Sequence, residues 1–323
     1  MSGSGDAPAL AVVIVAVTGT SSVERTMRHL RAQTARRAIE MIVVASASDA
    51  VDAAALSAGE FASFRVIPVG PILQRGAAAA IGMRAATAPI VGLVEDHSFP
   101  DPQWASALIV AHADDWAGVG PAVDNANPDS AMSWVNFILT YGIFSGTPRA
   151  GERDILPWHN SAYKRAALEP FTDRLGALLE WEGHLQEELR ASGHRLYLEP
   201  AARTRHLNVS KVRSTLGLHV LRGRILGALR AERERWSYGR RVVQAAAFPL
   251  FPLLHLRYLS AAMRAMPIPN ALAFRVYAGL GAALCVTAAA EAWGLLGGAG
   301  DSMARLEEYE LHRTRHLARA DAA

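Results

Sequence analysis

The stretch that decides the fold is Pro89-Ile-Val-Gly-Leu-Val94, followed at once by Glu95-Asp96-His97-Ser98-Phe99-Pro100. The first six residues are typical of a buried strand, and the strand ends in adjacent ionisable side chains. In an open α/β sheet such a strand end lies at the carboxyl edge, where these folds bind ligands. Glu95 and His97 are separated by one residue, so an extended turn directs both at one ligand, and this pair suits a divalent ion such as Mn²⁺ or Mg²⁺. A solvated loop with an Asp N-cap is the other interpretation of the same residues.

Strand and helix patterns alternate on both sides of this stretch. Apolar, β-branched runs predict strands, and segments with helical spacing and N-cap signals predict helices, the first of them capped by Ser21 or Ser22. The strands are expected at 11–17, 40–45, 64–68, 89–94 and 116–123, and the helices at 23–33, 49–58, 74–86 and 101–112. This alternation predicts an α/β fold with a mostly parallel sheet covered by helices on both faces.

Length and composition set further bounds. The 323 residues fit one large domain or two. Cys285 is the only cysteine, which excludes an intrachain disulfide and a cysteine-rich metal site and suits a reducing compartment. Residues 1–8 carry Asp6 and no basic residue, so we interpret the apolar run that follows as a buried strand and not as part of a signal peptide.

The C-terminal third combines basic and apolar segments. Residues 203–241 contain eleven Lys and Arg against Glu232 and Glu234, and the apolar run 242–254 that follows is broken by two prolines. Residues 271–299 are largely apolar, but the run between Arg275 and Glu291 is about 15 residues, shorter than the roughly 20 of a perpendicular span. These features predict a pair of helices in or on an anionic membrane surface, followed by a charged helix at 301–323. Nucleic acid is the other partner of a basic stretch, but the adjoining apolar segments argue against it.

Several motifs, in this order and spacing, resemble the inverting family 2 glycosyltransferases of the glycosyltransferase-A fold, in their membrane-associated bacterial type. The resemblance extends over residues 9–208. Its elements are the strand at Glu40-Met-Ile-Val-Val44, the Ala-rich helix 75–86, Glu95-Asp96-His97 at the Asp-x-Asp position before Pro102-x-Trp104, the segment Glu180-Trp181-Glu182 ahead of Gly193, and His206.

The chain also departs from the family's pattern. Ala45-Ser46-Ala47-Ser48 stands where an Asp pair usually contacts the base and ribose, with Asp49 displaced by a few residues. Ala78-Ala79-Ala80 replaces the usual Ala-Arg-Asn, although Arg75 lies one turn earlier and supplies a substitute cation.

The resemblance implies a role for each candidate residue. Transfer from a nucleotide-diphosphate sugar needs a metal ion to neutralise the leaving diphosphate and a carboxylate to take the proton of the acceptor hydroxyl. Glu182 is the expected base, although it is also interpretable as a solvated acid at a helix start, where acids favour the helix dipole. His206 is equally interpretable as a phosphate-side or surface histidine. The implied metal ligands are Glu95, His97 and His206; the donor-binding residues Thr18, Ser46, Arg75 and Asp96; and the acceptor or sugar contacts Trp158, His159, Asn160 and Trp181.

The sequence therefore predicts a catalytic domain over residues 1–210 and a helical membrane-associating region over 211–323, at the cytoplasmic face of the cell membrane. The expected partners are a nucleotide-sugar donor, the membrane surface, and an oligosaccharide or lipid-linked acceptor, with polyprenyl-linked glycans included. Residues 130–146 are interpreted as a buried helix or as a membrane-facing acceptor wall, and 151–154 as a mobile loop over the site. The alternatives are a catalytically silent nucleotide-sugar-binding or scaffold subunit of a glycan-assembly complex, and a nucleotidyltransferase on a similar sheet.

Overall fold

The computed structural model describes residues 7–46, 61–264 and 266–321, so the helix expected at 49–58 lies outside the described residues. The chain divides into two compact units. The first comprises residues 1–124 with 144–206, and the second comprises 125–143 with 207–323. The predicted functional division at residue 210 stays a prediction.

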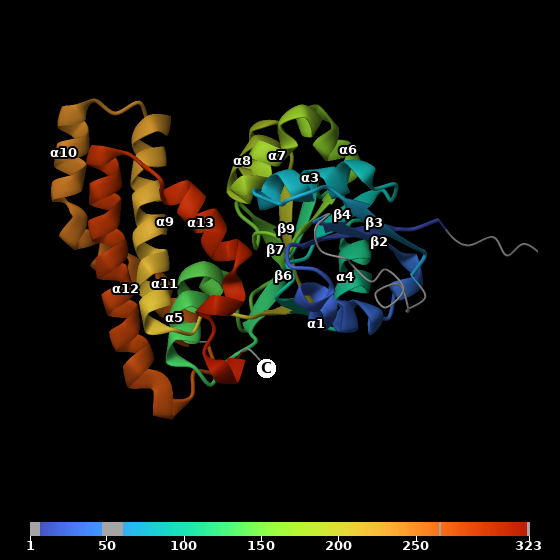
Figure 1. The fold of residues 1–323 in the computed structure, drawn as a ribbon, viewed down its shortest axis with the longest axis horizontal. Helices are drawn as coiled ribbons and strands as arrows, with labels where there is room; N and C mark the ends of the chain where they lie inside the picture. The colour runs from blue at the N-terminus through green and yellow to red at the C-terminus, as the bar shows by residue number, and fades with distance from the viewer. Residues whose placement is uncertain (1–6, 47–60, 265, 322–323) are drawn as a thin grey trace, which may run out of the picture. The chain divides into compact units, whose positions relative to one another are not determined.

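A mixed sheet forms the centre of the first unit, with strand order β3-β2-β1-β4-β8-β6-β9-β5 and β7 paired to β9 (Figure 1). The strands β3, β2, β1 and β4 run parallel, and every pair from β4–β8 onward with a described register is antiparallel. The predicted fold class is confirmed, but the sheet is mixed and not mostly parallel. Its strands are β1 (Leu10–Ala16), β2 (Ile39–Ala45), β3 (Ser63–Pro68), β4 (Ile90–Leu93), β5 (Ser98–Pro100), β6 (Gly118–Asn125), β7 (Gly151–Arg153), β8 (Ala162–Lys164) and β9 (Leu196–His206).

Helices cover both faces of this sheet because the side chains of a strand alternate between its faces. Val12 and Ile14 of β1 pack in one cluster with Met27 of α1 (Thr20–Arg31) and Trp104 of α4 (Trp104–Ala111). On the opposite face, a Cβ added to Gly82 of α3 (Arg75–Ala85) would lie 2.4 Å from the side chain of Val13. Only a residue without a side chain lets α3 lie this close to the sheet.

The other helices of the first unit follow β8. They are α6 (Arg165–Leu168), α7 (Leu175–Glu180) and α8 (Glu182–Ala191), with a 3-10 turn at Glu169–Arg174. A Cβ on Gly76 of α3 would lie 2.4 Å from the backbone nitrogen of Glu180, so α3 and α7 are in backbone contact. The Glu180 carboxylate also accepts from the N–H of Ala77 at 3.1 Å, which satisfies a free donor in the first turn of α3.

The second unit is helical. Its helices are α5 (Ala131–Tyr141), α9 (Val212–Arg233), α10 (Tyr238–Ala246), α11 (Phe251–Arg264), α12 (Asn270–Gly297) and α13 (Ser302–Leu311). Helices α9 and α12 lie side by side over much of their lengths (Figure 1). Seven residues of α5 are buried, Trp134 and Phe137 among them, which agrees with the interpretation of 130–146 as a buried helix.

Some local predictions are corrected. Gly19, in the left-handed region at φ 82°, is the N-cap of α1, two to three residues before the expected serines, and the Ser22 hydroxyl instead donates to the Gly19 carbonyl. Residues 151–153 are not a mobile loop, because they form β7 and pair with β9. The charged helix expected at 301–323 ends at Leu311 and gives way to short 3-10 turns.

Helix α12 runs without interruption through Arg275 and Glu291. Among the described residues it is long and apolar enough, by length and composition, to cross a membrane, and 28% of its most apolar window is buried. The buried Glu291 carboxylate pairs with Arg230 of α9 at 2.5 Å. The two charges that seemed to divide this apolar run are therefore a paired acid inside the unit and an arginine on its surface.

Candidate active site

The carboxyl edge of the parallel strands gathers the candidate residues, as the alternation of strand and helix predicts. Thr18 follows β1, Ser46 follows β2 and Glu95 follows β4. Thr18 is exposed, whereas Ser46 is buried. Successive parallel strands end at the same edge, so residues far apart in the sequence become neighbours there.

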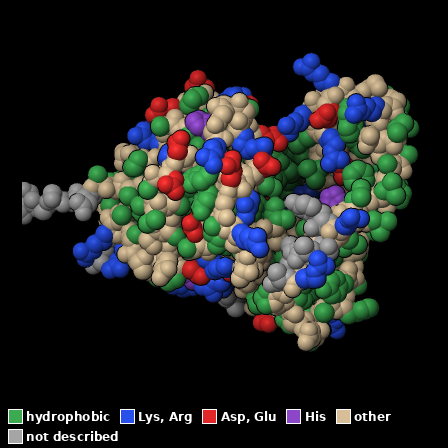
Figure 2. Space-filling view, turned by 180° about the vertical axis from the view of Figure 1, so that it is seen from behind, with side chains coloured by type: hydrophobic (Ala, Val, Ile, Leu, Met, Phe, Trp, Pro, Cys, Tyr) green, Lys and Arg blue, Asp and Glu red, His purple; other side chains and the backbone are tan. Residues whose placement is uncertain are grey.

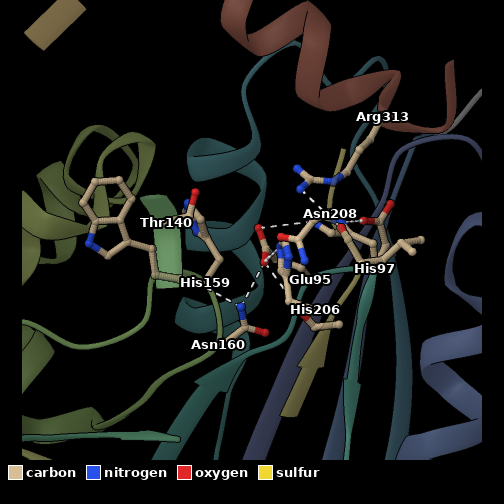
Figure 3. Close-up of polar contacts among 12 residues, drawn as sticks. Glu95, His97, Thr140, His159, Asn160, His206, Asn208 and Arg313 are labelled. Carbon is tan, nitrogen blue, oxygen red and sulfur yellow. Dashed lines mark hydrogen bonds and ion pairs between the residues drawn. The ribbon is translucent and has the colours of Figure 1, made fainter. Parts of the chain in front are cut away.

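Three ligand-competent side chains converge on one point of this edge. One ligand atom from each of Glu95, His97 and His206 lies within 4.8 Å of the others. His206 Nε2 lies 3.2 Å from Glu95 Oε2, and His97 Nε2 lies 3.6 Å from Glu95 Oε1. The register of two strands explains the convergence, because β5 and β9 pair Ser98 with His206 and so bring the end of β9 beside His97. Figure 3 shows Glu95 with both histidines directed toward it.

The arrangement fits a divalent metal ion. His97 is buried, and its Nε2 atom has no hydrogen-bond partner within the described part of the chain. Its other ring nitrogen, Nδ1, lies 2.6 Å from a carboxylate oxygen of Asp96. Ligating histidines in proteins are commonly held in this way, with the second nitrogen bound to a carboxylate so that the first is free to coordinate. Asp96, expected as a donor-binding residue, thus orients His97.

Two further side chains contact the carboxylate of Glu95. Asn160 Nδ2 donates to Oε2 at 2.9 Å, and Arg75 Nη1 lies 4.0 Å from Oε1. Arg75 belongs to the first turn of α3, so the cation expected to replace the family's missing arginine is at the site. Burial on its own raises the pKa of Glu95, but the positive charges of His97 and His206 and the hydrogen bond with His206 outweigh it and hold the pKa well below its usual value.

Glu182, the expected base, is the first residue of α8 and is fully buried. The hydroxyl of Tyr163 donates to its Oε1 atom, and the backbone N–H of His159 donates to Oε2. The imidazole of His159 lies 3.5 Å from the same Oε2 atom. Gln186, one turn along α8, donates to the Tyr163 hydroxyl at 3.0 Å and so orients it. The helix-end interpretation of Glu182 as a solvated acid is therefore wrong.

Burial raises the pKa of Glu182 to about 7, and the charge of Glu95 adds to this rise. The hydrogen bonds from Tyr163, His159 and Gln186 act in the opposite direction. A carboxyl group with a pKa near neutrality exchanges its proton readily at physiological pH, which is the property a general base needs. The same burial, with the Glu182 charge next in importance, raises the pKa of Tyr163 well above its usual value, so this residue stays a hydrogen-bond donor.

One turn of the chain links Glu95, in the cluster of Glu95, His97 and His206, to the expected base Glu182. His159 contacts Glu182 and the next residue, Asn160, contacts Glu95. His159 adopts φ 54°, in the left-handed region that residues other than glycine rarely occupy. Residues in such conformations persist where the surrounding contacts over-determine them, and they concentrate at functional sites.

The two tryptophans expected to contact the sugar pack against each other. The rings of Trp158 and Trp181 are tilted, with centroids 4.9 Å apart, and both are partly exposed. Gly183 lets Trp158 approach α8, because a Cβ there would lie 3.4 Å from the indole. The structure thus places Trp158, His159 and Trp181 beside Glu182 or the adjoining Gly183, whereas Asn160 contacts Glu95. Their role as acceptor or sugar contacts stays a prediction.

Sequence reasoning missed two residues of this site. Tyr163 and Gln186 hold Glu182, but nothing in the motif singles them out. The only available signal for Gln186 was its spacing of four residues from Glu182, which places both on one face of a helix. Tyr163 carried no signal, because its contact with α8 depends on the pairing of β8 in the sheet.

Comparisons with known proteins agree with this geometry. A family model described as glycosyl transferase family 2 matches residues 11–171, which contain β1 to β8 and the Glu95 motif. Over these residues the chain is similar to the family 2 glycosyltransferases. The chain is a glycosyltransferase. No curated protein matches the chain by sequence.

A solved glycosyltransferase structure shares the fold. The mannosyltransferase PcManGT from Pyrobaculum calidifontis, solved with GDP-Man and Mn²⁺, has a TM-score of 0.52 and 17% identity, over 89% of this chain and 88% of its own. GalNAc-T7, solved with UDP, GalNAc and Mn²⁺, has a TM-score of 0.45 and 16% identity, over 62% of this chain and 44% of its own. The likeness to the mannosyltransferase supports the glycosyltransferase-A fold assigned from the sheet.

Proposed function

We propose that this glycosyltransferase moves a sugar, with inversion, from a nucleotide-diphosphate sugar to an acceptor at a membrane surface. The observation that carries the proposal is the turn 158–160, which contacts both Glu95, one of the candidate metal ligands, and Glu182. A single displacement needs a leaving-group site and a base on opposite sides of the reacting carbon. That one turn holds both carboxylates supports their assignment to these two roles.

On the donor side, Glu95, His97 and His206 would hold a divalent metal ion, which supplies positive charge to the departing diphosphate. A set of two imidazoles and one carboxylate suits Mn²⁺ better than Mg²⁺, since Mg²⁺ prefers oxygen ligands. Arg75 adds a fixed positive charge beside Glu95. The presence of GDP-Man and Mn²⁺ in a mannosyltransferase of similar fold supports a nucleotide sugar and Mn²⁺ as the ligands.

On the acceptor side, Glu182 takes the proton of the attacking hydroxyl. Both of its oxygens accept hydrogen bonds in this conformation, and the side chain has no exposed surface. The acceptor therefore reaches Oε2 only when the turn at His159 moves and releases it. We infer that acceptor binding displaces this turn, while Tyr163 and Gln186 keep Glu182 in position.

The second unit supports an acceptor at the cytoplasmic face of the cell membrane, such as a polyprenyl-linked glycan. Exposed apolar side chains gather on its C-terminal helices, with Leu253 67%, Leu254 62% and Phe274 83% exposed. Figure 2 shows hydrophobic and Lys or Arg side chains close together on the surface of this unit. Such a surface suits an anionic bilayer, where apolar groups insert and basic groups meet the lipid headgroups.

The test is turnover by the full chain with a panel of nucleotide sugars, with Mn²⁺, Mg²⁺ or EDTA, and with vesicles that contain a polyprenyl-diphosphate sugar as acceptor. We expect release of nucleoside diphosphate with Mn²⁺ and loss of at least about a hundred-fold in rate for Glu182→Gln. Glu187→Gln, on the same helix, is the matched control and should retain the wild-type rate.

The outcomes separate the alternatives. Turnover with soluble sugars and none with any lipid-linked acceptor would remove the membrane acceptor from the proposal. Release of inorganic diphosphate would identify a nucleotidyltransferase. A Glu182→Gln variant as active as the wild-type protein would contradict the assignment of the base. The silent-subunit alternative is not favoured, because a buried carboxyl with a pKa of about 7 is retained beside the ligand cluster.

A further inference from the structure

A cavity lies within the second unit, between the start of α9 and the segment from α13 to residue 316. Its volume is about 380 Å³, within the range of small-molecule sites in proteins. The side chains that matter for its chemistry are those of Arg213, Ser214, Arg305, Tyr309, Arg315 and His316. None of them takes part in the active site described above.

Positive charge dominates this cavity. Three arginines and two histidines line it, against the single acid Glu308. Among the described residues, the guanidinium groups of Arg213 and Arg315 have no carboxylate partner within ion-pair distance. Arg305 has only a 3.9 Å contact with Asp301 four residues earlier, and because both side chains are exposed this contact neutralises little.

The start of α9 adds to the positive potential. Lys211 is its N-cap, its first turn carries no acidic residue, and no side chain caps its free N–H groups. Arg213 and Ser214 belong to that first turn and line the cavity. The N-terminus of a 22-residue helix carries a partial positive charge, which here is reinforced by cations instead of being compensated.

A ring stack and several hydrogen bonds fix the walls of the cavity. The rings of Tyr309 and His316 stack with centroids 3.6 Å apart. Tyr309 donates to the carbonyl of Ser214 at 3.1 Å, and His316 Nδ1 lies 3.0 Å from the Ser214 hydroxyl. Lys211 Nζ donates to the carbonyl of Arg315 at 2.6 Å. These bonds hold the C-terminal segment against the first turn of α9, so the cations converge on a preformed space.

We propose that this cavity binds the phosphate or diphosphate group of an organic phosphate ester. Guanidinium groups match phosphate oxygens in geometry and charge, and several convergent cations favour a compact group with more than one negative charge. The group comes either from a lipid headgroup or from a soluble phosphate ester. The assignment goes beyond the proposed sugar transfer and does not depend on it.

The first test is titration calorimetry of the full chain with sodium pyrophosphate at low ionic strength. EDTA is present, so that no metal ion supplies a second diphosphate site. The double substitution Arg213→Gln with Arg315→Gln is expected to weaken binding about ten-fold or more. Arg264→Gln with Arg319→Gln removes the same charge from exposed positions outside the cavity and should bind as the wild-type chain does. Both pairs lie on the surface, and circular dichroism checks that each variant is folded.

Equal weakening in the two double variants would overturn the proposal, because the effect would then be one of net charge alone. Absence of pyrophosphate binding to the wild-type chain would overturn it too, unless vesicle binding depends on the same arginines. Glu182→Gln is expected to bind pyrophosphate normally, which separates this site from a failure of sugar transfer.

Vesicle flotation then distinguishes the two sources. Phosphatidylcholine vesicles with phosphatidic acid present a phosphate monoester at a bilayer, and pure phosphatidylcholine vesicles are the control. If the Arg213 and Arg315 substitutions reduce flotation only with phosphatidic acid, the ligand is a lipid phosphate. If they weaken pyrophosphate binding and leave flotation unchanged, the ligand is a soluble phosphate ester. If they change neither, the cavity is not an anion site.

Discussion

Glu182 is the residue whose environment makes the most direct prediction. Its pKa of about 7 means that a general base at this position is half ionised near neutral pH. The transfer rate should therefore rise as the pH increases through about 7 and level off above it. Tyr163→Phe removes the hydroxyl that stabilises the carboxylate, so the rising limb should move to higher pH. The measurement is nucleoside diphosphate release as a function of pH for both proteins.

Tyr197→Phe is the matched control, because this tyrosine stacks on Trp116 and is not among the contacts of Glu182. A pH profile that does not move in Tyr163→Phe would contradict the role of the hydroxyl.

The stability of the protein should depend on pH in the opposite direction to its activity. Because the folded state raises the pKa of this carboxyl above 4.5, its contribution to stability is lost as the pH rises through about 7. Glu182→Gln should therefore gain stability relative to the wild-type chain as the pH rises from about 4.5 to about 7, and the difference should level off above pH 7.

Asp96 makes a second prediction at this scale. Its carboxylate lies 2.6 Å from His97 Nδ1 and fixes the ring with Nε2 free toward Glu95. Asp96→Asn weakens that restraint, and we expect Mn²⁺ affinity to fall about ten- to a hundred-fold. Calorimetric titration with Mn²⁺ in the absence of donor measures this directly. Asp114→Asn, an exposed substitution with the same charge change, should leave the affinity unaltered, and an equal loss in both variants would argue against the positioning role.

The sequence indicated the ligand cluster because its signals are local. Glu95 and His97 stand at the end of one strand, and His206 falls where the family pattern carries a histidine, so that pattern was sufficient to indicate all three. The function of Asp96 was not accessible in this way, since it depends on which ring nitrogen of His97 faces the carboxylate. The burial of Glu182 was also inaccessible, because Glu182 lies on α8 and Tyr163 reaches it from strand β8.

At the scale of elements, the packing of α9 on α12 is set by glycines. A Cβ on Gly294 of α12 would lie 2.0 Å from the carbonyl oxygen of Arg224, and one on Gly227 of α9 would lie 2.1 Å from that of Glu291. Both contacts are to backbone, which cannot yield without moving a helix. Gly294→Ala should therefore lower the free energy of unfolding by roughly 2 kcal/mol or more.

Gly281 provides a control within the same helix, because a Cβ there meets nothing within 4 Å. Gly281→Ala should raise stability by roughly 0.5–1 kcal/mol, since alanine loses less backbone entropy in a helix interior. Urea denaturation followed by circular dichroism compares the two variants. Similar destabilisation of both would show that the close approach of the helices does not limit the stability of this unit.

A helix or strand could be predicted from the sequence where its own residues show a clear apolar run or periodicity. Buried parallel strands such as β1 and β2 consist of continuous β-branched runs, and both were predicted within one residue of their observed ends. The strands β5, β7 and β8 have three residues each, too few for any periodicity. Their pairing is determined by the sheet around them, which is why 151–154 was interpreted as a loop and the sheet as mostly parallel.

At the scale of the whole molecule, the second unit gives the chain a surface that a catalytic domain does not require. Helix α10, the 3-10 turn after it and the first turn of α11 expose Val243, Leu250, Leu253 and Leu254, each more than half exposed. Arginines lie along the same helices, Arg240 and Arg241 among them. Exposed apolar groups beside basic ones favour binding to an anionic bilayer, with affinity that depends on both burial and charge.

Leu253→Gln with Leu254→Gln should therefore reduce flotation with anionic vesicles by about ten-fold or more, because each leucine that inserts contributes about 1.5–3 kcal/mol when fully buried. Leu73→Gln with Val110→Gln is the matched control, since these residues are equally exposed, at 76% and 73%, but belong to the first unit. If both pairs reduce flotation alike, binding is a general property of exposed apolar groups. If only the first pair reduces flotation, and if added salt weakens the binding that remains, the second unit is the membrane-binding part. Sugar transfer by the first unit then takes place where lipid-linked acceptors are found.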